Sequence, residues 1–144
     1  MTETIVVVDT SEIFEGKAPE VERAVKELVE FVEATEARPI AYSVYLDEER
    51  TRMTVVQVHP DSASMEYHLV VAAHVFRGFA GLIRLMSMDL YGRPGGRLLR
   101  QIRQKVEVLG NATVAVHELH AGLDRFGARA ASSGMGPSET ASPA

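Results

Sequence analysis

The sequence of 144 residues contains no cysteine and no tryptophan. The lack of cysteine excludes disulfides, thiolate metal ligands, cysteine nucleophiles and thiol-based redox sensing. Long hydrophobic runs are also missing, since no window approaches the roughly 18 apolar residues of a membrane helix. The apolar run that follows Thr4 is too short for the hydrophobic region of a signal peptide. We therefore expect a cytoplasmic protein that makes no use of a membrane.

An excess of positive charge is absent as well. The chain has 20 acidic and 15 basic residues, which gives a formal net charge of -5. General nucleic-acid binders gain most of their affinity from a basic surface that neutralises phosphates, so no nucleic-acid partner is expected. With 46% hydrophobic residues the chain can build a sizeable core. We expect one domain over 1–127 and, because 128–144 is rich in Ala, Ser, Gly and Pro, a disordered tail.

The stretch 41–82 has the clearest pattern. Two runs of β-branched and aromatic residues, 41–47 and 53–59, flank a polar segment that is long enough for a hairpin loop. Pro60 cannot donate to a β-ladder, and Asp61 can cap a helix by accepting from its first amides. This pattern predicts an antiparallel strand pair followed by a helix that begins at about Asp61.

That helix carries an apolar stripe with a histidine beside it. The stripe recurs at three- and four-residue spacing, and His68 lies on its border, aimed at the interior or its rim. His74 is six residues further on and should face another way. The stripe consists of Met65, Leu69, Ala72, Phe76 and Phe79.

The remaining elements follow from length, periodicity and turn residues. We expect strands at 5–9, 83–91 and 113–120, helices from Pro19 to the Pro39 boundary and over 98–109, and a connector at 11–17. In the 83–91 strand, Leu85 is expected on one face and Met86, Met88 and Leu90 on the other. The order predicts an α+β fold, ferredoxin-like βαββαβ with an extra C-terminal helix and strand.

Both faces of the predicted sheet carry apolar residues, for example Tyr42 and Val44 against Ala41 and Tyr45. A single helix layer can cover only one face. We therefore predict that a second copy covers the other, as a homodimer with twofold symmetry.

The same stretch resembles the antibiotic biosynthesis monooxygenase-like family of dimeric α/β barrels. The resemblance implies the barrel-like dimer and places the helix histidine of the family at His68. It is carried by Tyr42-Ser43-Val44-Tyr45, the acidic turn, Val55-Val56-Gln57-Val58-His59, Asp61, Met65, His68, Phe76 and Phe79.

The sequence departs from the family at the end of the second hairpin strand. The acidic-x-aromatic pattern of the family is here Gln57-Val58-His59, so no acidic partner for His68 is evident. The haem-degrading branch uses a tryptophan, an asparagine on the first strand and a histidine further along the helix. None of these is present, since the first strand begins Ile5-Val6-Val7-Val8-Asp9 and Arg77-Gly78-Phe79-Ala80 holds no histidine, so haem breakdown is disfavoured.

Three residues are candidates for catalysis. His68 can exchange a proton near neutral pH, although a histidine bonded to a carbonyl or to Tyr42 would be structural only. Tyr42 and Gln57 could orient a substrate, provided that the hairpin register brings Tyr42 to the Gln57 face. Tyr42 could equally be an ordinary strand residue whose hydroxyl finds a partner.

Seven further residues are candidates for the substrate cavity. Apolar stripes of this kind are more often plain core than a pocket wall, so both interpretations stay open. These residues are His59, Leu69, Ala72, Phe76, Phe79, Met86 and Met88.

No metal or cofactor is expected. His117 and His120 are three residues apart on a predicted strand and point to opposite faces, unlike the helical zinc motif with its four-residue spacing. Gly92-Arg93-Pro94-Gly95-Gly96-Arg97 could hold an anion at a helix start, but it lacks the lysine and spacing of a phosphate loop and is better explained as a turn.

Two functions are compatible with this pattern. The resemblance implies a cofactor-independent monooxygenase for a small phenol- or hydroquinone-like aromatic, in which a base forms a substrate anion that itself reduces O2. The alternative is a non-catalytic dimeric barrel that binds a small apolar ligand, since one fold hosts many functions.

Overall fold

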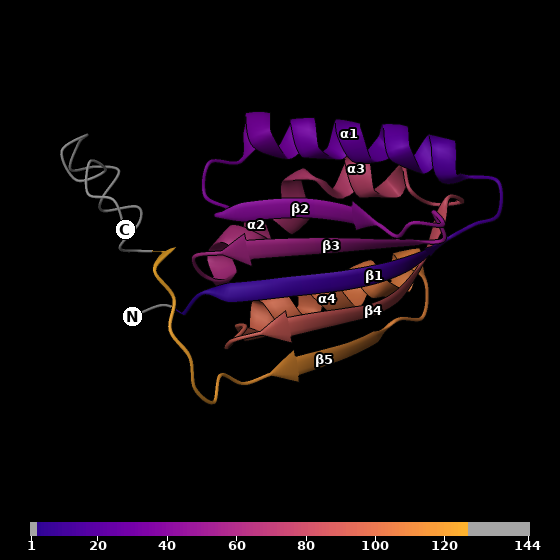
Figure 1. The fold of residues 1–144 in the computed structure, drawn as a ribbon. Coiled ribbons are helices and arrows are strands. Elements are labelled where there is room, and N and C mark those ends of the chain that lie inside the picture. The colour runs from indigo at the N-terminus through magenta and orange to yellow at the C-terminus, as the bar shows by residue number, and fades with distance from the viewer. Residues whose placement is uncertain (1–2, 127–144) are drawn as a thin grey trace.

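The computed structural model describes residues 3–126, so the predicted tail over 128–144 lies outside the described residues. The described part forms one five-stranded sheet with a layer of helices (Figure 1). The elements in chain order are β1 (Ile5–Ile13), α1 (Ala18–Thr35), β2 (Ala41–Leu46), β3 (Arg52–His59), α2 (Ser62–Val71), α3 (Ala73–Arg77), β4 (Ile83–Tyr91), α4 (Gly96–Leu109) and β5 (Thr113–His117).

The strand order is β2-β3-β1-β4-β5. The first four strands are antiparallel to their neighbours, and β5 is added parallel to β4 at the edge. This is the ferredoxin-like arrangement with an appended α4–β5 unit, as the sequence predicts. The hairpin strands begin and end within one residue of their predicted limits.

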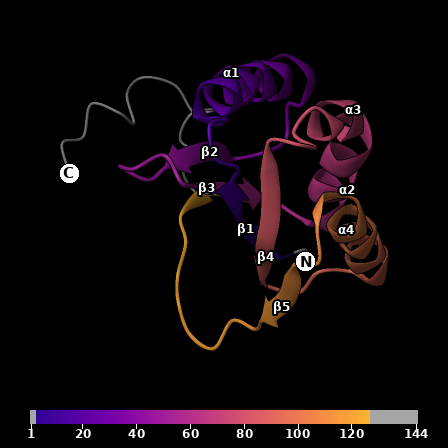
Figure 2. The same cartoon turned by 90° about the vertical axis from the view of Figure 1, so that its right-hand side faces the viewer.

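The four helices cover a single face of the sheet (Figure 2). The buried stripes of α1 and α4 pack there against alternate residues of the strands, as the amphipathic patterns predict. On β1 the covered residues are Ile5, Val7, Asp9, Ser11 and Ile13, whereas the residues between them are only half buried. Within residues 3–126, no helix lies over the opposite face of the sheet.

The first strand is longer than predicted. Ser11–Ile13, which the sequence analysis assigned to a connector, continues the ladder, with Ser11 opposite Met53 and Glu12 opposite Arg52. Polar residues at these positions have weak β propensity. The pairing on both sides of a central strand outweighs that local preference.

The predicted single helix over the central stripe is two helices. Ala72 has φ -93° and ψ 3°, which ends α2 and starts α3. The β-branched pair Val70 and Val71 directly before it is a weak helix former. The break leaves Phe76 on α3 and Phe79 beyond it, yet both stay buried.

A bulge reverses the predicted faces in β4. The register between β1 and β4 shifts between Thr10 and Ser11, which pair with Ser87 and Leu85, and Met86 is left without a partner in β1. The extra residue brings Leu85 to the same covered face as Met88. The prediction that Leu85 opposes Met88 is therefore wrong, and Met86 is half buried and lies outside the core cluster.

The last strand is shorter than predicted. β5 ends at His117, so His120 lies beyond it. The chain from there to residue 126 runs on the side of the sheet away from the helices (Figure 2).

Among the described residues, no helix has the length and apolar character needed to span a membrane.

Candidate functional site

A buried carboxyl–imidazole pair lies between α1 and α2. His68 Nδ1 is 2.7 Å from Oε2 of Glu36, the residue that caps the C-terminus of α1. Both side chains are almost fully inaccessible, with exposures of 0% and 1%. The expectation that His68 lacks an acidic partner is therefore wrong, because the carboxyl group comes from another helix and not from the end of β3.

The protonation of His68 follows from this geometry. Burial lowers the pKa of His68, and the hydrogen bond to Glu36 opposes that shift only in part. A neutral imidazole that donates from Nδ1 to Glu36 has a free lone pair on Nε2. Within residues 3–126, Nε2 is buried and has no hydrogen-bond partner. The arrangement presents a fixed, neutral base.

Aromatic rings enclose this base. The Tyr42 ring centroid is 5.1 Å from that of His68, and the Phe76 centroid is also 5.1 Å away, both edge to face. Burial raises the pKa of Tyr42 well above its usual value, and the nearby Asp9 and Glu36 add to the rise. Tyr42 is therefore a neutral hydroxyl donor at physiological pH.

The hairpin register places Tyr42 directly opposite Gln57, on the helix-covered face. Gln57 Oε1 accepts from His59 Nε2 at 2.8 Å, and Ser64 Oγ lies 2.7 Å from His59 Nδ1. Burial lowers the pKa of His59 to about 4, so this ring is neutral. Its centroid is 6.0 Å from that of His68.

A small cavity of about 30 Å³ lies beside Tyr42 and Phe76, the two rings that pack against His68, but His68 itself does not line it. Tyr42, Phe76 and Phe79 contribute to its wall together with Asp9 and Lys105. Lys105 Nζ lies 4.0 Å from Asp9 Oδ2 and 4.0 Å from the centre of the Phe76 ring. Burial raises the pKa of Asp9 and lowers the pKa of Lys105, and each of the two charges opposes the shift of the other. The volume is enough for one or two water molecules.

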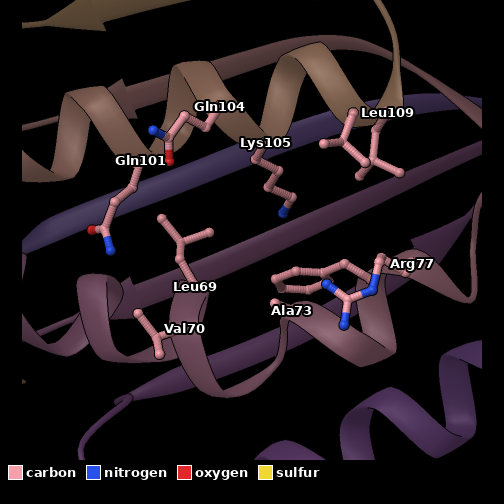
Figure 3. A pocket seen from close by; sticks show the side chains of 10 residues that line it. Leu69, Val70, Ala73, Arg77, Gln101, Gln104, Lys105 and Leu109 are labelled. Atoms are coloured by element: carbon pink, nitrogen blue, oxygen red, sulfur yellow. The ribbon is translucent and has the colours of Figure 1, made fainter.

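A larger pocket of about 260 Å³ opens between α2–α3 and α4 (Figure 3). Phe76, Lys105 and Leu109 line both this outer pocket and the small cavity. The two spaces therefore share part of their walls. Phe76 also packs edge to face on His68, so the same ring contacts the outer pocket, the small cavity and the imidazole.

Of the seven predicted cavity residues, His59 is fully buried and lines neither space, and the other six divide into three groups. Phe76 and Phe79 line the cavity, and Leu69 lines the outer pocket. Ala72 and Met88 are fully buried members of the core. Met86 does not accompany Met88, because of the β4 bulge.

Three polar residues near His68 were not predicted from the sequence, although the spacing of each from buried neighbours indicates an inward side chain. Glu36 is four residues after Val32 and so continues the inner stripe of α1. Asp9 follows Ile5 and Val7 at the period of a strand. Lys105 lies three residues after Ile102 and four before Leu109, beside the buried stripe of α4.

The described residues contain no group of three or more His, Cys, Asp or Glu side chains arranged to hold a metal ion. His117 Nε2 is 2.8 Å from Asp89 Oδ1, and its ring stacks on Tyr91 with centroids 4.5 Å apart. These two contacts occupy the histidine that the sequence analysis had weighed as a ligand.

The fold is ferredoxin-like, and a carboxyl–imidazole pair is buried between its helices. The same fold occurs in solved structures of antibiotic biosynthesis monooxygenase-like proteins, in agreement with the sequence resemblance. SnoaB from Streptomyces nogalater, a cofactor-independent oxygenase, superposes with a TM-score of 0.51 at 13% identity, over 65% of this chain and 95% of that chain. A candidate antibiotic biosynthesis monooxygenase from Deinococcus radiodurans gives a TM-score of 0.51 at 15% identity, over 64% and 94%.

A further solved structure superposes on a larger part of this chain. MupZ from Pseudomonas fluorescens superposes with a TM-score of 0.67 at 17% identity, over 87% of this chain and 91% of that chain. At these identities the likeness concerns the fold. No protein-family model matches the sequence, and no curated protein matches it.

Proposed function

We propose that the protein is a cofactor-independent monooxygenase for a small phenol- or hydroquinone-like substrate. The observation that carries the proposal is the buried His68, held by Glu36 through Nδ1 at 2.7 Å and with Nε2 free for a proton. SnoaB, a cofactor-independent oxygenase with the same fold, supports oxygenation without a cofactor as the class of reaction.

In the proposed reaction His68 Nε2 removes the phenolic proton. The resulting phenolate is a strong enough reductant to pass an electron to O2, and the two radicals combine at a ring carbon as a peroxide. Protonated His68 gives the phenolic proton to the peroxide, and its neutral Nε2 then removes the proton from the ring carbon while the O–O bond breaks. The departing hydroxide takes this second proton from His68, so that one phenol and one O2 give one quinone and one water and His68 is again neutral.

Tyr42 and Gln57 have supporting roles in this proposal. The Tyr42 ring packs against His68 and lines the small cavity, and its neutral hydroxyl would donate to a developing oxyanion. The Gln57 amide nitrogen is buried without a partner among residues 3–126, and its oxygen is fixed by His59. Phe76 and Phe79 would contact the substrate ring.

Oxygen uptake with naphthols and hydroquinones tests the proposal. We expect turnover by the wild type, a fall of about 10²- to 10⁴-fold in His68→Ala, and little change in His74→Ala. His74 is a suitable control because it is exposed and its ring packs edge to face on Phe31. Equal turnover in both variants would reject His68 as the base. Saturable ligand binding without oxygen uptake would instead support the non-catalytic binder.

We further propose a homodimer that pairs the uncovered sheet faces. Val6, Val8 and Val56 are half buried on this face, and Tyr45 is 59% exposed. Leu119, in the segment after β5, is 63% exposed and lines a pocket together with Val6. Apolar groups of this kind are typical of the core of a homodimer interface.

Sedimentation analysis tests the dimer. Val8→Glu should shift the protein towards monomer, because it places a charge in the proposed interface. Val108→Glu should not, since Val108 is 66% exposed on the helix layer. A wild-type monomer at micromolar concentration would overturn the proposal.

A further inference from the structure

The charges of the outer pocket have one sign. In the described part of the chain, its charged lining residues are Arg77 and Lys105, and both are cations. This is notable in a chain with a net charge of -5. The rest of the wall is apolar or amide-bearing: Leu69, Val70, Ala73, Phe76, Gln101, Gln104, Val108 and Leu109.

The Lys105 ammonium group has no carboxylate oxygen of residues 3–126 within hydrogen-bond distance. Its side chain is only 11% exposed, yet Nζ is 4.0 Å from the nearest Asp9 oxygen, beyond hydrogen-bond distance. The same nitrogen lies 4.0 Å from the Phe76 centroid, which is a cation–π contact. Figure 3 shows the side chain extending from α4 towards α3. A largely buried ammonium group at this distance from its carboxylate can still accept a closer anionic partner.

A second polar group in the pocket is also unsatisfied. Gln101 Oε1 is buried without a hydrogen-bond partner within the described chain. Gln101 and Arg77 come from different helices, α4 and α3, and line the same opening. Polar groups from both walls thus converge on a space that is otherwise apolar, which is the usual composition of a small-molecule site.

We propose that the outer pocket binds an aromatic carboxylate, with the carboxylate at Lys105 and Arg77 and the ring against Leu69, Phe76 and Val108. This rests on the proposed function, because it makes the substrate an aromatic acid that enters between α2–α3 and α4. The volume of about 260 Å³ is near the lower limit for small-molecule sites and suits one or two fused rings. Phe76 touches both the pocket and His68, so it links binding with the base.

Calorimetric titration with 2-naphthoate and 2-naphthamide tests the proposal, because the two probes share shape and differ in charge. We expect the carboxylate to bind about tenfold more tightly, and the difference to shrink with added salt. Arg77→Met and Lys105→Met should each weaken naphthoate about fivefold or more and leave naphthamide nearly unchanged. Arg103→Met is the matched control, since Arg103 is exposed on α4 and does not line the pocket.

Methyl NMR locates the bound probe. Naphthoate should shift the methyl signals of Leu69, Val70 and Val108, which line the pocket. Arg77 is exposed, so Arg77→Met keeps the test valid even if Lys105→Met fails to fold. Equal affinity for the two probes, no binding of either, or shifts confined to other methyls would overturn the proposal.

The outcome is separable from that of the catalytic proposal. His68→Ala should bind naphthoate as the wild type does, because His68 does not line the outer pocket. Carboxylate selectivity without oxygen uptake would reject catalysis alone. Oxygen uptake with neutral naphthols, without carboxylate selectivity, would reject the aromatic acid alone.

Discussion

Glu36 and His68 are separated by 32 positions in the chain, but their side chains meet at 2.7 Å in the interior. The contact joins the end of α1 to the middle of α2. It fixes which nitrogen of the imidazole carries the proton, and thereby which nitrogen is free to act as a base.

The first prediction concerns this pair. Glu36→Ala should lower the free energy of unfolding by about 2 kcal/mol, because it leaves a buried imidazole N–H without a partner. Glu33→Ala, an exposed position of the same helix, should change it by less than about 0.5 kcal/mol. Urea unfolding measures both. Imidazole ¹⁵N shifts of the wild type should show protonated Nδ1 and bare Nε2 at His68, and the reverse tautomer would contradict the proposed base.

The second prediction is a dependence of stability on pH that originates at His59. Its pKa is about 4 in the folded protein, against 6.5 for an unperturbed histidine. The unfolded chain therefore binds the proton first, so stability that is fully present above pH 6.5 is lost as the pH falls towards 4. The loss should amount to about 3 kcal/mol for this residue. His59→Asn should flatten the urea-derived profile in this window, whereas His74→Asn should leave the slope in place.

The residues around His68 differ in how far the sequence alone could predict their positions. The period of the helix was enough to aim His68 at the interior or its rim, because side-chain direction follows from local backbone geometry. The face of Tyr42 depended on the hairpin register, which the structure supplies by pairing Tyr42 with Gln57. The partnership of His68 with Glu36 depends on how two helices pack, and no local spacing specifies that. Asp9 and Lys105 were overlooked because charged residues are rarely buried, and only the fold shows that they face each other.

The third prediction tests the bulge in β4, which interrupts the alternation of side chains between the two faces of the sheet. Met88→Ala should cost about 3 kcal/mol, because Met88 is 0% exposed and its loss leaves a cavity. Met86→Ala should cost about 1 kcal/mol, since Met86 is half buried and outside the core cluster. Denaturation of the two variants under the same conditions is the measurement. Equal losses would mean that both methionines face the helices, as strict alternation requires.

The fourth prediction concerns the start of α2. Asp61 Oδ1 accepts from the Ser64 amide at 2.9 Å, and its other oxygen pairs with Arg38, which lowers the pKa of Asp61. Asp61→Ala should cost about 1 kcal/mol, because the cap is lost. Asp61→Asn keeps an oxygen for the cap and should cost only a few tenths of a kcal/mol. Thermal unfolding compares the two, and an equal loss in both would assign the effect to the ion pair with Arg38.

The position of α4 in the chain has a consequence for how proteins of this shape diversify. The βαββαβ unit is complete at Tyr91, and it already contains Glu36, Tyr42 and His68. Lys105 and one wall of the outer pocket come afterwards, from α4. The other wall, with Arg77 and Phe76, belongs to the βαββαβ unit itself. Under the proposed roles, insertions or deletions in the α4–β5 segment would alter one wall of the recognition pocket while Glu36, Tyr42 and His68 keep their places in the sheet and helices.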